Sequence, residues 1–166
     1  MATITLKGNP CRTSGELPAV GKRAPTLSLV RQDLSTATLA DYAGRTKVLN
    51  IFPSIDTAVC ATSVRTFAEK AADADAVVLH VSADLPFAAK RFCAAEGIEG
   101  AQTLSTFRGG FARAWGVEIV DGPLAGLCAR AVVVLDGKDR VVHAELVPEI
   151  AQEPDYDSAL AAIGLT

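Results

Sequence analysis

A proline, a threonine and a cysteine stand close together in the run NIFPSIDTAVC, which covers residues 50–60. The apolar residues before Pro53 have the composition of a strand, and Pro53 ends it because proline has no N–H for the strand ladder. Cys60 stands where a helical pattern begins, so the sequence predicts this cysteine in the first turn of a helix. Backbone N–H groups are unpaired there and the helix dipole is positive, which favours the thiolate, the reactive form of cysteine.

Two interpretations of Cys60 compete. A cysteine is often a small buried apolar residue, and its position alone favours that interpretation. Thr57 shifts the balance, because its hydroxyl lies three residues upstream and can hydrogen-bond both the sulfur and a substrate. Together the two residues indicate a nucleophilic thiolate.

The overall composition limits the classes of protein to consider. A chain of 166 residues predicts one domain, spanning residues 1–166, with a substantial core. A net charge of −3 without runs of Lys and Arg argues against binding to nucleic acid. No apolar stretch approaches the about 20 residues of a membrane helix. The first residues lack the basic-then-apolar pattern of an export signal, so we expect a cytoplasmic protein.

The four cysteines are Cys11, Cys60, Cys93 and Cys128, and they form no C-x-x-C pair. Four cysteines in a chain of this size do not indicate a disulfide scaffold. The two histidines are far apart in sequence, which argues against a zinc site. We therefore expect no bound metal, and some of these thiols to be chemically active.

Strand-like and helix-like segments alternate along the chain. This order predicts an α/β fold with a thioredoxin-like central sheet flanked by helices, and with an added N-terminal β-hairpin within residues 1–15. In that fold the Cys60 helix follows a central strand. We expect strands at residues 26–30, 47–52, 76–82, 101–105, 131–135 and 141–146, a turn with a short helix or irregular segment at 33–42, and helical segments at 63–74, 87–96, 111–115 and 155–165.

Pro53, Thr57 and Cys60 match the peroxiredoxin pattern Pro-x-x-x-Thr-x-x-Cys. Over nearly its whole length the chain resembles one peroxiredoxin subfamily, the thiol peroxidases, which are atypical two-cysteine peroxiredoxins. The resemblance implies reduction of hydrogen peroxide and organic (alkyl) hydroperoxides, thioredoxin as the electron donor, a homodimer, and neither a metal nor a bound cofactor. The motifs that carry it, besides NIFPSIDTAVC, are GNP at 8–10, SADLPFA at 82–88, RFC at 91–93, DGPLAGL at 121–127 followed by Arg130, and EPDY at 153–156.

The same resemblance implies a role for each site residue. Cys60 is the peroxidatic cysteine, oxidised to sulfenic acid, and Cys93 is the resolving cysteine that converts this acid to an intramolecular disulfide. Thr57 would hold the sulfur and the incoming oxygen together, and Pro53 would limit access by water. Arg130 would place a permanent cation beside the thiolate. From the sequence alone, a surface ion pair is the more typical place for such an arginine.

A disulfide between Cys60 and Cys93 requires their Cα atoms to lie within ~7 Å, yet the two residues are expected on separate helices. At least one helix should therefore unwind locally during turnover. We expect weaker order in the oxidised protein around residues 57–65 and 88–97.

Other interpretations stay open at this point. A thioredoxin-fold disulfide reductase would need the missing C-x-x-C pair, and a redox sensor or binding module would use Cys60 as a switch without turnover. Cys128 stands two residues before Arg130. If the strand reaches back to it, both side chains face the same way and Cys128 can form off-pathway disulfides. The alternative is a small loop residue.

Overall fold

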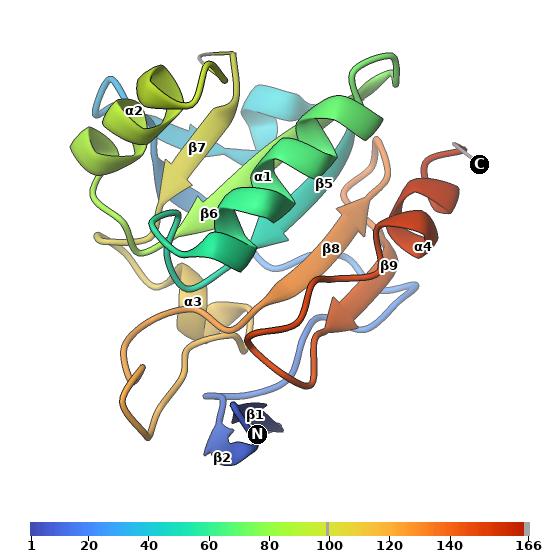
Figure 1. The fold of residues 1–166 in the computed structure, drawn as a ribbon. Helices are drawn as coiled ribbons and strands as arrows, with labels where there is room; N and C mark the ends of the chain where they lie inside the picture. The colour runs from blue at the N-terminus through green and yellow to red at the C-terminus, as the bar shows by residue number, and fades with distance from the viewer. Residues whose placement is uncertain (99, 165–166) are drawn as a thin grey trace.

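The structure is a computed structural model that describes residues 1–98 and 100–164. In this part of the chain a seven-stranded mixed sheet has the order β4-β3-β7-β6-β5-β8-β9, and a separate β1-β2 hairpin lies beyond one end of it (Figure 1). The strands are β1 (Thr3–Leu6), β2 (Asn9–Arg12), β3 (Ser28–Val30), β4 (Thr36–Thr38), β5 (Thr46–Ile51), β6 (Ala76–Ser82), β7 (Gln102–Ser105), β8 (Ala131–Leu135) and β9 (Val141–Leu146). The helices are the 3-10 helix η1 (Leu39–Tyr42), α1 (Ala58–Lys70), α2 (Pro86–Ala95), α3 (Phe111–Ala114) and α4 (Tyr156–Ala161).

Strand β5 lies at the centre of the sheet, parallel to β6 and antiparallel to β8. These three strands consist largely of valine, leucine and isoleucine, as expected for strands covered on both faces. The register places Asn50 opposite His80, and Ile51 opposite Ala131. The start of β8 therefore lies beside the end of β5, from which the chain continues to Cys60.

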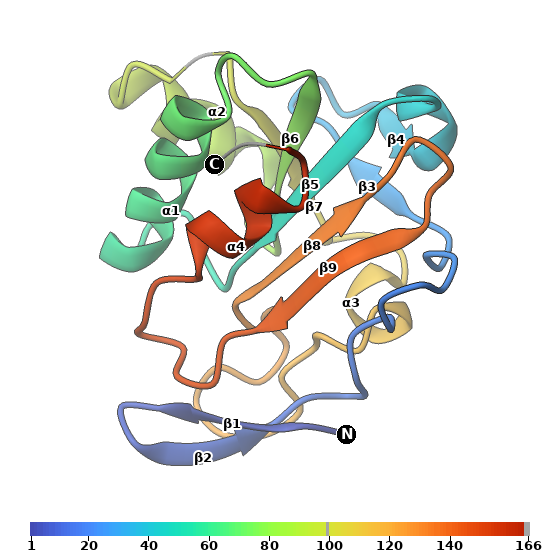
Figure 2. The ribbon, with the colours of Figure 1, turned by 90° about the vertical axis from the view of Figure 1, so that its right-hand side faces the viewer.

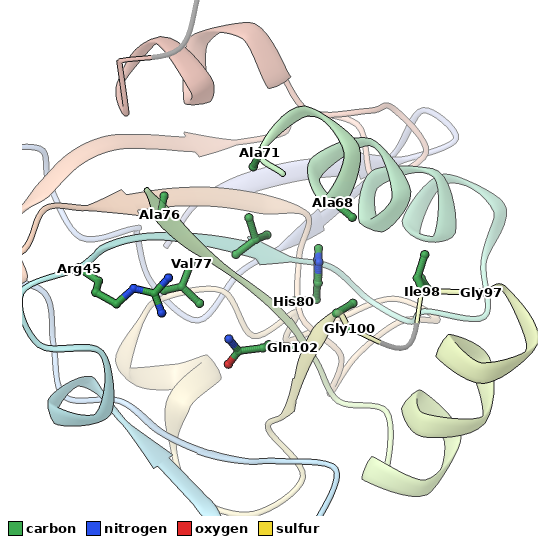
Figure 3. A pocket seen from close by; sticks show the side chains of 12 residues that line it. Arg45, Ala68, Ala71, Ala76, Val77, His80, Gly97, Ile98, Gly100 and Gln102 are labelled. Carbon is green, nitrogen blue, oxygen red and sulfur yellow. The ribbon is translucent and has the colours of Figure 1, made fainter. Parts of the chain in front are cut away.

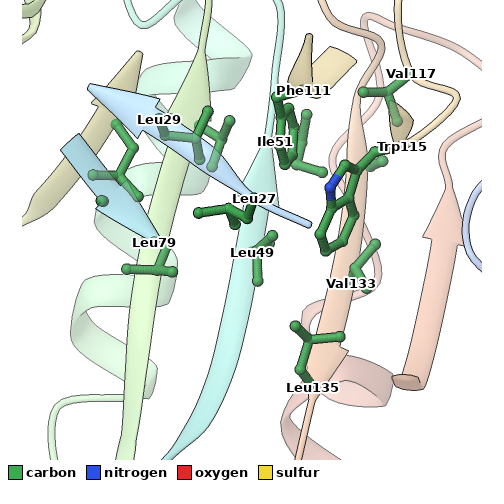
Figure 4. Packing of buried hydrophobic residues seen from close by; sticks show 14 of the residues in the cluster. Leu27, Leu29, Leu49, Ile51, Leu79, Phe111, Trp115, Val117, Val133 and Leu135 are labelled. Atoms are coloured by element: carbon green, nitrogen blue, oxygen red, sulfur yellow. The ribbon is translucent and has the colours of Figure 1, made fainter. Parts of the chain in front are cut away.

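Alternate residues of β5 point to opposite faces of the sheet. Leu49 and Ile51 pack in the larger core with Trp115, on the face that α3 and η1 cover (Figure 4). Val48 packs on the other face with Phe67 of α1, in a cluster that α4 completes (Figure 2). Asn50 shares the direction of Val48, which places a buried amide under α1.

The described elements confirm the predicted α/β sheet with its N-terminal hairpin. The strands predicted at 76–82, 131–135 and 141–146 have these bounds in the structure. The segment 33–42 was predicted without a strand, which is wrong because Thr36–Thr38 pairs with β3. Three residues of the sequence TAT give too short a pattern for recognition.

Two helix bounds also differ from the prediction. α1 begins at Ala58, before the helix formers of residues 63–74, because the chain turns into the helix directly after Thr57. α4 ends at Ala161, whereas the prediction ran to residue 165, which lies outside the described residues. Asp155 caps this helix, since its carboxylate accepts a hydrogen bond from the Ser158 amide. Within the described segments, no helix combines the length and apolar character that crossing a bilayer requires.

A buried ion pair ties β5 to the turn between β8 and β9. The Lys47 ammonium is fully buried and donates to Asp139 Oδ1 at 2.6 Å and to the Asp136 carbonyl oxygen at 3.3 Å. Removing one partner of a buried pair leaves the other charge without compensation. The pair should therefore be a stability determinant far from Cys60.

We expect Asp139→Asn to lower the free energy of unfolding by about 3 kcal/mol. Asparagine keeps the shape of the side chain and tolerates the positive φ of 63° at this position, so the loss reports the charge. Urea unfolding of the reduced protein measures it. The matched control is Asp157→Asn, which breaks an exposed pair with Lys70 and should cost less than about 1 kcal/mol. Equal losses in the two variants would contradict this account of the pair.

Candidate active site

Cys60 is the third residue of α1 and is fully buried. Thr57 is the N-cap residue of this helix, but its side chain caps none of the helix amides in the described structure. Its hydroxyl instead donates to the Ser54 carbonyl oxygen at 3.0 Å, and Thr57 is exposed. The positive end of the helix is thus left available to a negative charge near Cys60. The hydrogen bond from Thr57 to the sulfur that the sequence suggested is not among the contacts of the described residues.

Arg130 is buried beside Cys60, with only 2% of its surface exposed. Its Nη2 donates to the Cys60 sulfur at 3.2 Å, and its Nε donates to the Ile150 carbonyl oxygen at 2.8 Å. Nη1 is buried and has no hydrogen-bond partner in the described part of the chain. The surface ion pair that is typical of such an arginine is therefore wrong for this residue. The register of β8 with β5 explains the burial, because it brings the start of β8 against the Cys60 turn.

A pocket of about 450 Å³ lies over Arg130. Pro53 and Thr57 line it from the loop before α1, while Leu6 and Lys7 line it from the turn of the N-terminal hairpin. The separate N-terminal hairpin thus forms one wall of this pocket. Apolar side chains make up most of the remaining wall: Val59, Leu124, Leu127 and Ile150. The pocket can hold an apolar molecule with one polar group directed at Arg130.

Cys93 lies on α2 and is buried, separate from the helix that carries Cys60. Both sulfurs are free thiols in this structure. The Gln32 amide nitrogen lies 3.9 Å from the Cys93 sulfur and donates to Thr103 Oγ1 at 2.6 Å. Burial raises the pKa of the Cys93 thiol, and the hydrogen bond from Gln32 opposes this rise. The contact of Gln32 with Cys93 could not be predicted from the sequence, because the two residues are 61 positions apart in the chain.

Asp84 holds the loop that leads to Cys60. Its Oδ1 accepts a hydrogen bond from the Ser54 hydroxyl at 2.8 Å, and its Oδ2 accepts one from the Ile55 amide at 2.7 Å. The Ser82 hydroxyl adds a third bond to Oδ2 at 2.6 Å. Asp84 itself lies just before α2, so one carboxylate connects the approach to the Cys60 helix with the start of the Cys93 helix.

Asp84→Ala should release the loop before α1, because hydrogen bonds to a charged group contribute about 1.5–3 kcal/mol each. We expect the Ile55 amide to exchange with solvent at least tenfold faster in the reduced variant, as measured by NMR. The matched control is Asp56→Ala, which removes an exposed carboxylate of the same loop. Unchanged Ile55 exchange in Asp84→Ala would refute the role given to Asp84.

The other two cysteines lie in apolar surroundings. Cys128 packs in the larger core, and burial is the main cause that raises its pKa to about 12, which disfavours the reactive thiolate. β8 begins at Ala131, so the strand alternation that would orient Cys128 like Arg130 does not extend back to it. Cys11 lies on β2 of the hairpin and is buried, and burial followed by the charge of Asp121 raises its pKa. The burial of Cys128 and its raised pKa count against the off-pathway disulfides considered for it from the sequence.

No three His, Cys, Asp or Glu side chains within residues 1–98 and 100–164 gather closely enough to hold a metal ion.

Comparisons with known proteins agree over the length of the chain. The model of the Redoxin family matches residues 19–160. The thiol peroxidases of Mycobacterium bovis and Mycobacterium tuberculosis are each 57% identical over 164 residues, which cover 99% of this chain and 99% of theirs. The crystal structure of a peroxiredoxin-like protein from Aquifex aeolicus superposes with a TM-score of 0.92 at 38% identity, covering 99% of this chain and 96% of that one.

Proposed function

The chain belongs to the thiol peroxidases of the Redoxin family, with a thioredoxin-like peroxiredoxin fold, and on this premise we propose that it reduces hydrogen peroxide and organic hydroperoxides through Cys60 and Cys93. The observation that carries the proposal is the contact of the Arg130 guanidinium with the Cys60 sulfur at 3.2 Å. A fixed cation in a buried site favours the thiolate, which is the nucleophile for a peroxide oxygen.

In the first step the Cys60 thiolate attacks the terminal oxygen of the hydroperoxide. An S–O bond forms and the O–O bond breaks, so that the sulfur is oxidised to sulfenic acid. The leaving alkoxide, or hydroxide when the substrate is hydrogen peroxide, takes up a proton and departs as alcohol or water.

Forming the thiolate is not sufficient for a peroxidase. Complete conversion of a free cysteine to thiolate at neutral pH would account for only a small part of an enzymatic rate enhancement. Stabilisation of charge on the stretched O–O bond has to supply the larger part. The Arg130 Nη1 group supports this role, since it is buried without a partner among the described residues and belongs to the guanidinium whose Nη2 contacts the sulfur. We assign it to the peroxide oxygens, with the amides of the first turn of α1 as further donors.

The pocket over Arg130 supports organic hydroperoxides as substrates. Its wall is mostly apolar, and its volume of about 450 Å³ exceeds what hydrogen peroxide needs. Pro53 and Thr57 line this pocket together with Arg130, in keeping with roles in excluding water and in guiding the incoming oxygen.

In the second step the Cys93 thiol attacks the sulfenic acid, an S–S bond forms and water leaves. The two sulfurs lie on separate helices, so at least one helix has to unwind for this step. Unwinding would also bring Cys93 into water, where the desolvation that raises its pKa is relieved. A dithiol such as thioredoxin then returns two electrons by thiol–disulfide exchange. We place the enzyme in the cytoplasm as a homodimer, as the resemblance to thiol peroxidases suggests.

Turnover of peroxide by cysteine variants tests the two thiols. With thioredoxin, thioredoxin reductase and NADPH, Cys60→Ser should show no turnover. Cys93→Ser should consume about one equivalent of peroxide and then stop, because its sulfenic acid lacks the second thiol. Cys128→Ala is the control and should retain full activity. Wild-type rates in Cys60→Ser would end the proposal, and stoichiometric oxidation of the wild type without turnover would favour a redox sensor.

Replacing Arg130 tests the charge stabilisation. Arg130→Lys keeps the positive charge, but a compact ammonium lacks the planar fork that bonds both the Cys60 sulfur and the Ile150 carbonyl. We expect kcat/KM for an alkyl hydroperoxide to fall by about 10²- to 10³-fold, the size of losing one oriented donor. Arg113→Lys, at an exposed ion pair with Glu118, should leave kcat/KM unchanged. Full activity of Arg130→Lys would show that charge without orientation suffices.

A further inference from the structure

Three polar residues are buried together between α1 and the central sheet. Asn50 on β5 donates from its Nδ2 atom to the Ser63 hydroxyl at 3.2 Å, and the same nitrogen lies 3.1 Å from His80 Nδ1 on β6. The Ser63 hydroxyl donates in turn to the carbonyl oxygen of Cys60 at 2.8 Å. We call these three residues, Asn50, Ser63 and His80, the Asn50 clamp. Its chain of hydrogen bonds ends at the backbone of Cys60, the proposed peroxidatic residue.

The direction of each hydrogen bond in the Asn50 clamp follows from its members. An amide nitrogen only donates, so Nδ1 of His80 accepts and the ring proton lies on Nε2. This requires a neutral ring, which agrees with burial lowering the pKa of His80 to about 4. The ring lines a pocket of about 370 Å³ and points toward α1 (Figure 3). Because Asn50 supplies a proton to Ser63, the hydroxyl proton of Ser63 is directed to Cys60.

Apolar side chains in place of Asn50 and Ser63 would need no hydrogen-bond partners. Asn50 and Ser63 are fully buried, and the Oδ1 atom of Asn50 has no hydrogen-bond partner in the described part of the chain. A buried acceptor without a partner is destabilising. One turn further along α1, Phe67 attaches the helix to the sheet by apolar packing instead.

The two attachments differ in what unwinding does to them. Hydrogen bonds of the Asn50 clamp can be exchanged for bonds to water at a small net free energy. Releasing Phe67 would expose a whole aromatic side chain to water, which is much less favourable. The start of α1 also packs Val64 against Phe52 and Ile55. The Asn50 clamp is therefore the polar part of this attachment and the part that water can replace.

We propose that the Asn50 clamp positions the first turn of α1 for the peroxide step and sets how readily that turn is released for disulfide formation. The proposal rests on the proposed function, in which Cys93 resolves the sulfenic acid of Cys60. As long as the wound turn is the dominant form, weakening the clamp changes the peroxide step little. The rate of disulfide formation rises in proportion to the released fraction.

The test separates the two steps in Ser63→Ala, which removes the hydroxyl that links Asn50 to Cys60. Reduced protein is mixed with one equivalent of peroxide, quenched with dimedone at successive times, and analysed by intact mass. We expect disulfide formation to be faster by about two- to tenfold, which corresponds to the loss of one net hydrogen bond. We expect the rate constant for oxidation by peroxide to stay within about twofold of the wild type. The yield of sulfinic acid at excess peroxide should fall, because the sulfenic acid is resolved sooner.

The matched control is Thr62→Ala, on the exposed side of the same turn. The Thr62 hydroxyl donates to the Ala58 carbonyl oxygen at 2.9 Å, so this variant loses the same kind of hydrogen bond without any link to the sheet. We expect no change in either step. Asn50→Leu should accelerate disulfide formation like Ser63→Ala, and the double variant should gain little more, because both changes break one chain of bonds.

Three results would overturn the proposal: equal effects of Ser63→Ala and Thr62→Ala on disulfide formation, a slowed peroxide step with unchanged disulfide formation, or additive effects of Asn50→Leu and Ser63→Ala. Amide exchange of the wild type gives a test that needs no variant. In the disulfide form, protection should be lost at residues 61–64 and kept at 67–70, and retained protection at both would also overturn it. Absence of a Cys60–Cys93 disulfide in the wild type refutes the proposed function itself, which distinguishes that failure from a failure of the clamp.

Discussion

The contact between Arg130 and Cys60 is the interaction on which the other features of the site depend. A buried guanidinium needs a negative or strongly polar partner, because its removal from water is costly. None of the ion pairs in the described segments includes Arg130, and its partners are the Cys60 sulfur and the Ile150 carbonyl oxygen. In a site of low polarity a cation and a thiolate attract each other more strongly than in water. Burial is thus unfavourable for the Arg130 charge, but it also strengthens the attraction between that charge and a thiolate at Cys60.

Strand β5 gives this contact its geometry. Its register with β8 determines where Arg130 lies, and its end at Ile51, shortly before Pro53, determines where the chain turns toward α1. The ion pair of Lys47 holds the other end of the strand to the β8–β9 turn. Between these ends, Asn50 directs an amide to the face under α1. One central strand therefore positions Cys60, Arg130 and the underside of α1, so that small shifts of the sheet would also displace the Cys60 sulfur.

The sequence predicts those parts of this arrangement that depend on neighbours along the chain. Cys60 at a helix start follows from Pro53 and the helical pattern, and the long apolar strands follow from their composition. The burial of Arg130 does not follow, because it depends on a strand register between segments 70 residues apart. The roles of Asp84 and Gln32 cannot be predicted from the sequence either, since their contacts with the two cysteine segments join distant parts of the chain. The polar character of Asn50 inside an apolar strand is the one local signal that could have marked the underside of α1.

The two cysteine helices are attached to the body of the protein in different ways, and the difference matters for the proposed disulfide between them. The fully buried side chains of α2 are the small ones of Pro86, Ala89 and Cys93, while Phe92 is partly buried against the cluster around Cys60. α1 buries Phe67 in its far part, and near Cys60 it combines the apolar packing of Val64 with hydrogen bonds. The hydrogen bonds near Cys60 are contacts that water can replace, whereas the packing of Phe67 is not. A site can then be rigid enough to orient a thiolate against a peroxide and still release the oxidised sulfur for the proposed disulfide step, because hydrogen bonds near Cys60 can be exchanged for bonds to water while Phe67 keeps the far part of α1 on the sheet.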